Sequence, residues 1–199
     1  MKTKRLAAML AMAGASLYAG QSAAPQKATV TVCMENDPHV LMGVRPMASA
    51  MFARIAVRID WREMDSCPAG VGAIQVRLSH DSTKVRGSGA EALAFAQPYE
   101  GRIVVFLDRV DELNRNRGLS VLASVLASVL VHEITHVLEG ISRHSSTGIM
   151  KARWDYRDYF EMSRKSLPFA PEDLNLIYNG LKVPRVAPAV VTQAAVAGQ

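Results

Sequence analysis

The chain has 199 residues, of which 49% are hydrophobic and 21% charged. This composition is typical of one folded domain and argues against a disordered chain. The formal net charge of +5 falls to +2 without the first 24 residues, which hold Lys2, Lys4 and Arg5 and no acidic residue. Nucleic-acid binding would require a clustered basic face, so we expect no nucleic-acid partner.

The first 24 residues have the pattern of a secretory signal peptide. Their basic start is followed by the uncharged apolar run 6–19 and then by small residues up to Ala24. The run has 14 residues, which is too short to span a bilayer comfortably, so an uncleaved anchor is the less favoured alternative. We expect residues 1–24 to be removed, with cleavage between Ala19 and Lys27, and the mature chain to be secreted or periplasmic.

Alternating and β-branched runs predict strands in the first half of the chain, with one helix at 47–56. The expected strands are 28–34, 57–61, 74–78, 90–96 and 102–107. The run 102–107 is more apolar than 90–96, so it is expected to lie closer to the centre of the sheet. Cys33 and Cys67 either form one disulfide, as is common in exported proteins, or remain two buried thiols.

A helical pattern replaces the strand pattern at 119–138, where Gly118 and Gly140 flank a run without Pro or Gly. Because this run is apolar nearly all round, we expect it to be buried against the sheet. A membrane span is less favoured, since His132 and Glu133 interrupt the uncharged stretch. A last helix is expected at 171–181, followed by a loose Ala/Val/Pro-rich tail at 182–199. The element order predicts an α+β or mixed α/β domain.

His132, Glu133 and His136 form an HExxH pattern on the long helix. Histidines four residues apart lie on one helix face, about one turn apart, where both can bind one Zn²⁺. Glu133 follows the first histidine directly and projects beside the metal. That is the position of a general base acting on metal-activated water.

A catalytic zinc usually takes three protein ligands, so a third must come from outside the HExxH pattern. Gly140 can end the helix in a left-handed turn, after which the chain reverses and brings back His144. Glu139 is a rival ligand that would require a bent helix, and Asp155 is a further carboxylate that stays open. We expect His144 to be the third ligand.

The segment HEITHVLEGISRH followed by SSTGIM, residues 132–150, resembles the metzincin superfamily of zinc peptidases, and most closely its matrixin-like members. The usual metzincin pattern is HExxHxxGxxH, whereas here Gly140 lies one residue and His144 two residues further along. The longer spacing also resembles that of secreted bacterial proteins with a similar GIM turn. Met150 matches the methionine that lies beneath the metal in a tight turn.

The resemblance implies a metzincin-like α+β fold over residues 25–181. Such a fold has a twisted, mostly parallel sheet with an antiparallel edge strand, packed on a long active-site helix and followed by the Met-turn and a C-terminal helix. It implies Zn²⁺ as cofactor and a protein or peptide substrate paired along an edge strand, here 90–97. Because the apolar runs are short, we expect no stable membrane span after signal removal.

The function expected from these residues is that of a secreted zinc-dependent endopeptidase. It would hydrolyse peptide bonds with metal-activated water and Glu133 as general base. The alternative is an exported zinc-binding protein without turnover, built on a protease scaffold.

Overall fold

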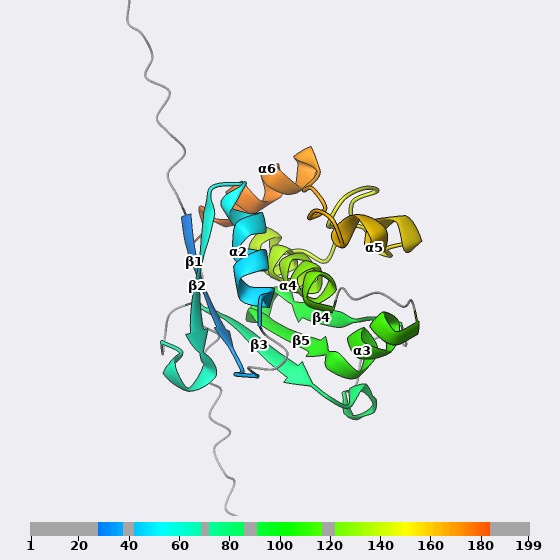
Figure 1. The fold of residues 1–199 in the computed structure, drawn as a ribbon. Helices are drawn as coiled ribbons and strands as arrows, with labels where there is room; N and C mark the ends of the chain where they lie inside the picture. Colours follow the sequence, from blue (N-terminus) through cyan, green and yellow to red (C-terminus); the bar gives the residue numbers. More distant parts are fainter. Residues whose placement is uncertain (1–27, 38–41, 69–71, 86–90, 117–121, 184–199) are drawn as a thin grey trace, which may run out of the picture.

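The computed structural model describes residues 28–37, 42–68, 72–85, 91–116 and 122–183 (Figure 1). The expected signal peptide and residues 184–199 of the expected tail lie outside the described residues. The predictions made for these two segments therefore stay predictions.

One five-stranded sheet runs in the order β2-β1-β3-β5-β4. Its strands are β1 (Ala28–Met34), β2 (Val57–Glu63), β3 (Ile74–Ser79), β4 (Ala94–Gln97) and β5 (Arg102–Phe106). All neighbours pair parallel except β4, which pairs antiparallel with β5 at the edge. The expected mostly parallel sheet with an antiparallel edge strand is confirmed, and the apolar β5 is the more central of the last two strands.

Helix α4 (Leu122–Glu139) is the expected long helix, and α2 (Val44–Ala53) packs beside it (Figure 1). The sequence predicted α2 at 47–56, but it begins earlier and includes Pro46. A proline in the first turn removes no helical hydrogen bond, because the first backbone N–H groups of a helix have no partner within it. The last helix, α6 (Pro171–Gly180), agrees with the prediction and also contacts α4.

Two further helices, α3 (Leu107–Asn116) and α5 (Tyr156–Met162), were not predicted. Both are rich in charged residues. In α3 the apolar residues Leu107 and Val110 lie three apart and are buried, which is helical spacing. In α5 the side chain of Asp155 accepts hydrogen bonds from the backbone N–H groups of Arg157 and Asp158, a cap that favours a helix start at this point.

The core lies between the sheet and α4. Alternate residues of the parallel strands face it, including Val32, Ile74 and Val105, and all of α4 from Val125 to Glu139 is buried. Among the described residues α4 is the one helix long and apolar enough to cross a membrane, and 83% of it is buried inside the protein. The helix α4 is apolar nearly all round because it packs against the sheet, α2 and α6.

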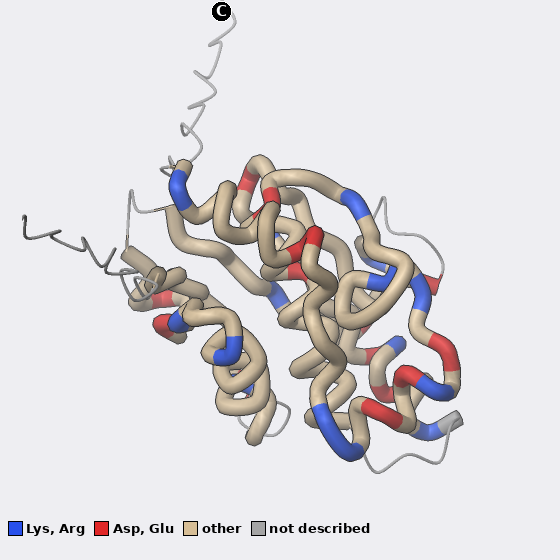
Figure 2. The backbone as a smooth tube through the Cα atoms, turned by 90° about the horizontal axis from the view of Figure 1, so that it is seen from above, with Lys and Arg blue, Asp and Glu red and all other residues tan. Residues whose placement is uncertain are grey.

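Charged residues of both signs are interspersed along the described backbone (Figure 2). No described segment in that view gathers Lys and Arg without acidic neighbours. Charged side chains also pair within the fold, as Arg45 does with Glu63 and Arg77 with Glu35. The expected absence of a nucleic-acid partner stays a prediction.

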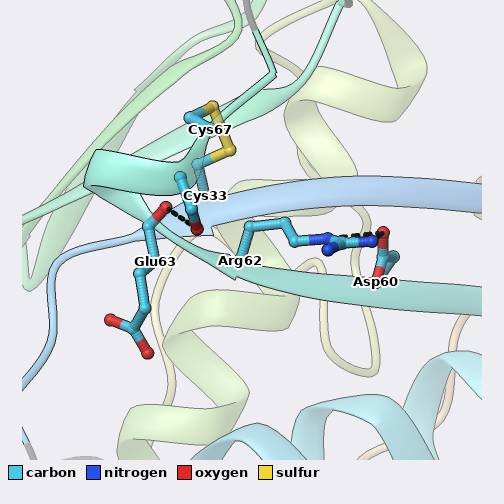
Figure 3. Close-up of a disulfide and its surroundings, with 6 residues drawn as sticks. Cys33, Asp60, Arg62, Glu63 and Cys67 are labelled. Carbon is cyan, nitrogen blue, oxygen red and sulfur yellow. Dashed lines mark hydrogen bonds and ion pairs between the residues drawn. A yellow bond between two sulfur atoms is a disulfide. The ribbon is translucent and has the colours of Figure 1, made fainter.

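A disulfide joins Cys33 in β1 to Cys67, just after the short 3-10 turn η1 (Met64–Ser66) that follows β2 (Figure 3). Their Cα atoms are 5.6 Å apart, within the range that a disulfide requires. Of the two alternatives for these cysteines, the disulfide is therefore the one found. The bond fastens the end of β1 to the segment leaving its neighbour β2.

Replacing both cysteines by alanine should lower the free energy of unfolding by about 2–4 kcal/mol, because the bond closes a loop in the unfolded chain. The two cysteines are 34 residues apart. Urea unfolding of parent and double variant measures the loss. The parent unfolded in a thiol reductant should match the double variant, and equal midpoints with and without reductant would contradict the prediction.

Candidate metal centre

Three histidines converge at the end of α4. His132 and His136 lie one helical turn apart with their Nε2 atoms 3.0 Å from each other. His144 returns from the loop after the helix, and the three rings offer ligand atoms that all lie within 4.8 Å of one another. The structure thus brings together the three residues that the sequence proposed as ligands.

The return loop begins where Gly140 ends α4 with φ of +71°, a left-handed conformation that favours glycine. Its backbone N–H donates to the carbonyl of His136 at 3.0 Å. The rival ligands lie outside the three-histidine cluster. Glu139 faces Arg143, with 3.6 Å between Oε2 and Nε, and Asp155 caps α5 and pairs with Lys151.

Hydrogen bonds fix which nitrogen of the two helix histidines faces the cluster. Nδ1 of His132 lies 2.8 Å from the carbonyl oxygen of Ile149, and Nδ1 of His136 lies 3.3 Å from that of Ile141. A carbonyl only accepts hydrogen bonds, so each Nδ1 carries the proton and each Nε2 keeps its lone pair. This is the outer-shell arrangement that orients metal-binding histidines in proteins.

Burial keeps these imidazoles neutral. It lowers the pKa of His132 to about 4 and that of His136 to about 3, and it also lowers the pKa of His144. Two lone pairs that face each other across 3.0 Å repel unless a cation lies between them. Two nitrogens bound to one tetrahedral zinc would be about 3.3 Å apart. The donor set therefore fits a zinc ion.

The expected Met-turn supports the cluster through backbone hydrogen bonds. Gly148 has φ of +74°, and both Ile149 and Met150 are fully buried. The Ile149 backbone N–H donates to the Pro168 carbonyl at 2.8 Å, while its own carbonyl accepts from His132. The Met150 carbonyl accepts from the backbone N–H of Ser145 at 2.8 Å. The turn thus holds the first histidine directly and the residue after the third.

Glu133 is buried between α4 and the edge strand. Burial raises its pKa to about 8, and a hydrogen bond with the backbone of Ala96 in β4 acts in the opposite direction. A dication held by the neighbouring histidines would lower this pKa, because a nearby positive charge favours the carboxylate. The carboxyl group therefore lies in the same cleft as the three histidines, next to β4.

A cleft of about 930 Å³ opens over the cluster. Its lining includes the segment 91–96, which contains the start of β4, and the segment 151–154 together with Tyr159. Among the described strands β4 is the last in the sheet and pairs only with β5, so its other edge has no strand partner there. The edge strand that the sequence placed at 90–97 is a strand only over Ala94–Gln97, with residue 90 outside the described residues, and it borders the site.

Among solved structures, an archaemetzincin from Methanopyrus kandleri superposes with a TM-score of 0.52 over 80% of this chain and 99% of that chain. The fold is metzincin-like. Sequence identity is 13%, so the likeness concerns the fold. No protein-family model and no curated protein matches the sequence.

Several residues of this site were missed from the sequence. Trp154 lines the cleft and meets His132 edge-on, with 5.5 Å between ring centroids. Arg143 and Asp173 form an ion pair, with Nη2 and Oδ1 2.5 Å apart, next to His144. In the sequence, Asp173 indicated only the start of a helix, where acidic residues are common. No sequence pattern connected it to Arg143, which lies 30 positions earlier.

Replacing Gly148 by alanine should cost more stability than replacing Gly43, although both have positive φ. A Cβ on Gly148 would lie 2.3 Å from the Pro168 carbonyl oxygen, whereas one on Gly43 would meet nothing within 4 Å. Each variant carries backbone strain of about 1–3 kcal/mol, and Gly148→Ala adds the collision. Urea unfolding of the zinc-free proteins measures both losses, and equal losses would contradict this account of the turn.

Proposed function

We propose that this chain is an exported zinc-dependent endopeptidase. One observation carries the proposal: three neutral histidines with ligand atoms within 4.8 Å of one another stand beside buried Glu133, under a cleft bordered by an open strand edge. The metzincin-like fold supports it, because the solved structure to which this fold is similar is that of an archaemetzincin.

Each residue has a defined part in the proposed reaction. His132, His136 and His144 would hold the ion, with the two helix rings oriented by the carbonyls of Ile149 and Ile141. Bound zinc would supply Lewis-acid polarisation of the peptide carbonyl and an acidified water. Glu133 takes the proton of the attacking water and delivers it to the leaving amine.

The open edge of β4 is the proposed binding site for the substrate. An extended peptide could add to this edge by backbone hydrogen bonds, which would give affinity for peptides irrespective of their side chains. Because Glu133 reaches the backbone of Ala96, a peptide paired with β4 would pass directly over the carboxyl group. A protein or peptide is therefore the proposed substrate.

The environment of Glu133 favours catalysis over zinc binding alone. An ionisable group placed in a buried site costs folding free energy, which a binding module could avoid with an apolar residue. Glu133 is 7% exposed and its pKa is raised by that burial. Such perturbed groups in clefts are characteristic of catalytic acids and bases.

Export is proposed from the signal-like segment at 1–24, with removal of that segment. The disulfide between Cys33 and Cys67 supports it, because structural disulfides persist mainly in oxidising compartments outside the cytosol.

Zinc binding should depend on all three histidines. We expect one zinc per chain in protein purified after expression of the full chain. His144→Ala should weaken binding by more than about 100-fold, since loss of an outer-shell partner alone typically costs 10–100-fold. Chelator competition measures the affinity. The control is His80→Ala, an exposed histidine paired with Asp37. Unchanged affinity in His144→Ala would transfer the third-ligand role to Glu139 or Asp155.

Glu133→Gln should retain zinc and lose about 10²–10⁴-fold in peptide cleavage, because the amide cannot accept the water proton. Cleavage of a mixed peptide library measures the loss, and zinc content is measured on the same samples. Glu112→Gln in α3 is the matched control on an exposed glutamate. A parent that binds zinc tightly and cleaves no peptide would favour the alternative, a zinc-binding protein without turnover.

A further inference from the structure

Asp173, in the first turn of α6, is a carboxylate with no exposed surface. Its Oδ1 accepts from Nη2 of Arg143 at 2.5 Å and from Oγ of Ser145 at 2.5 Å, and its Oδ2 accepts from the Ala170 N–H at 2.8 Å. A buried charge is tolerated only when it is paired and hydrogen-bonded in this way. Two of the three donors come from the return loop after α4.

These two donors flank His144 on either side. Nη1 of Arg143 also donates to the His144 carbonyl oxygen at 3.4 Å and to Oγ of Ser145 at 3.1 Å. The Ser145 N–H in turn donates to the Met150 carbonyl. The backbone of His144 is therefore held between α6 and the Met-turn. We refer to Arg143, Ser145 and Asp173 as the His144 anchor.

His144 needs such an anchor more than the other two histidines do. Its side chain is exposed and comes from a loop, whereas His132 and His136 are buried on a rigid helix. Within the described part of the chain, its ring makes no hydrogen bond like those that orient the helix rings. A metal ligand must be held within about 0.5 Å of its productive position. For His144, that precision must come from the backbone.

Arg143 also connects the anchor to the end of α4. Its Nε lies 3.6 Å from Oε2 of Glu139, whose side chain is fully buried. The guanidinium group thus lies between two buried carboxylates, one on α4 and one on α6. Arginine presents several donors in a fixed planar fork, and here the fork binds Asp173 and the His144 carbonyl, while its contact with Glu139 is an ion pair without a hydrogen bond.

We propose that Arg143 and Asp173 are positioning residues for the third zinc ligand, so that α6 sets the zinc affinity of the site. The inference rests on the proposed zinc site. It goes beyond that site because zinc affinity would also depend on α6, a helix that supplies no ligand. The competing explanation is that the ion pair stabilises the fold and has no specific effect on His144.

A double-mutant cycle separates the two explanations. Zinc affinity is measured by chelator competition for the parent, Arg143→Ala, His144→Ala and the double variant. We expect Arg143→Ala to weaken zinc binding by about 10–100-fold, as loss of outer-shell support typically does. The double variant should bind zinc as His144→Ala does, because without the ring the anchor has nothing to position. Losses that multiply would overturn the proposal.

Further variants keep the test decisive if Arg143→Ala does not fold. Asp173→Asn retains the size and one acceptor of the side chain, and Arg143→Lys retains the charge but not the fork. Each substitution should weaken zinc binding when His144 is present. Added to His144→Ala, it should cause no further loss of zinc affinity. The control Arg62→Ala removes an exposed ion pair with Asp60 in β2, and its zinc affinity should equal that of the parent.

The outcomes also distinguish this inference from the proposed function. A parent that binds no zinc would overturn both. A parent that binds zinc, with unchanged affinity in Arg143→Lys and Asp173→Asn, would overturn the anchor alone. Full cleavage activity and full zinc affinity in folded Arg143→Ala would also overturn the anchor alone.

Discussion

The polar side chains that α4 carries into an apolar core need partners there, and segments on both sides of the helix in the chain supply them. His132 and His136 face the carbonyls of Ile149 and Ile141, and Glu133 reaches the backbone of Ala96. Unpaired polar groups at these buried positions would each cost free energy of about 1–3 kcal/mol. The paths of the return loop, the Met-turn and β4 follow from this constraint.

The HExxH pattern, the return of His144 and most of the strands could be predicted from local signals, and the mostly parallel sheet and the Met-turn from the resemblance to metzincins, whereas the strand order β2-β1-β3-β5-β4 was not predicted. Helical spacing, a glycine stop and β-branched alternation are readable over a few residues. The start of α2 and the helices α3 and α5 were not predicted, and these segments contain proline or many charged residues. Both are compatible with helix ends and exposed helix faces.

The partners of the site residues could not be predicted, because they depend on contacts between distant segments. The partner of His132 is the backbone carbonyl of Ile149, which any residue at position 149 would also provide. The residue type therefore gives no sign of this contact. Asp173 serves as a hydrogen-bond acceptor for the Ala170 N–H, which explains its place in the first turn of α6. Its second use as partner of Arg143 appears only when the loop and α6 are brought together.

Each residue of the longer segment before His144 makes a contact of its own or lines the cleft. Between Gly140 and His144, Ile141 gives its carbonyl to the His136 ring, Ser142 lines the cleft, and Arg143 joins the loop to α6. A lengthened loop costs little entropy, about 0.6 kcal/mol for each doubling, but it also loses precision unless it gains contacts. Here the extra residues bring their own contacts, so the length that separates this chain from the usual metzincin pattern also supplies the means of holding His144.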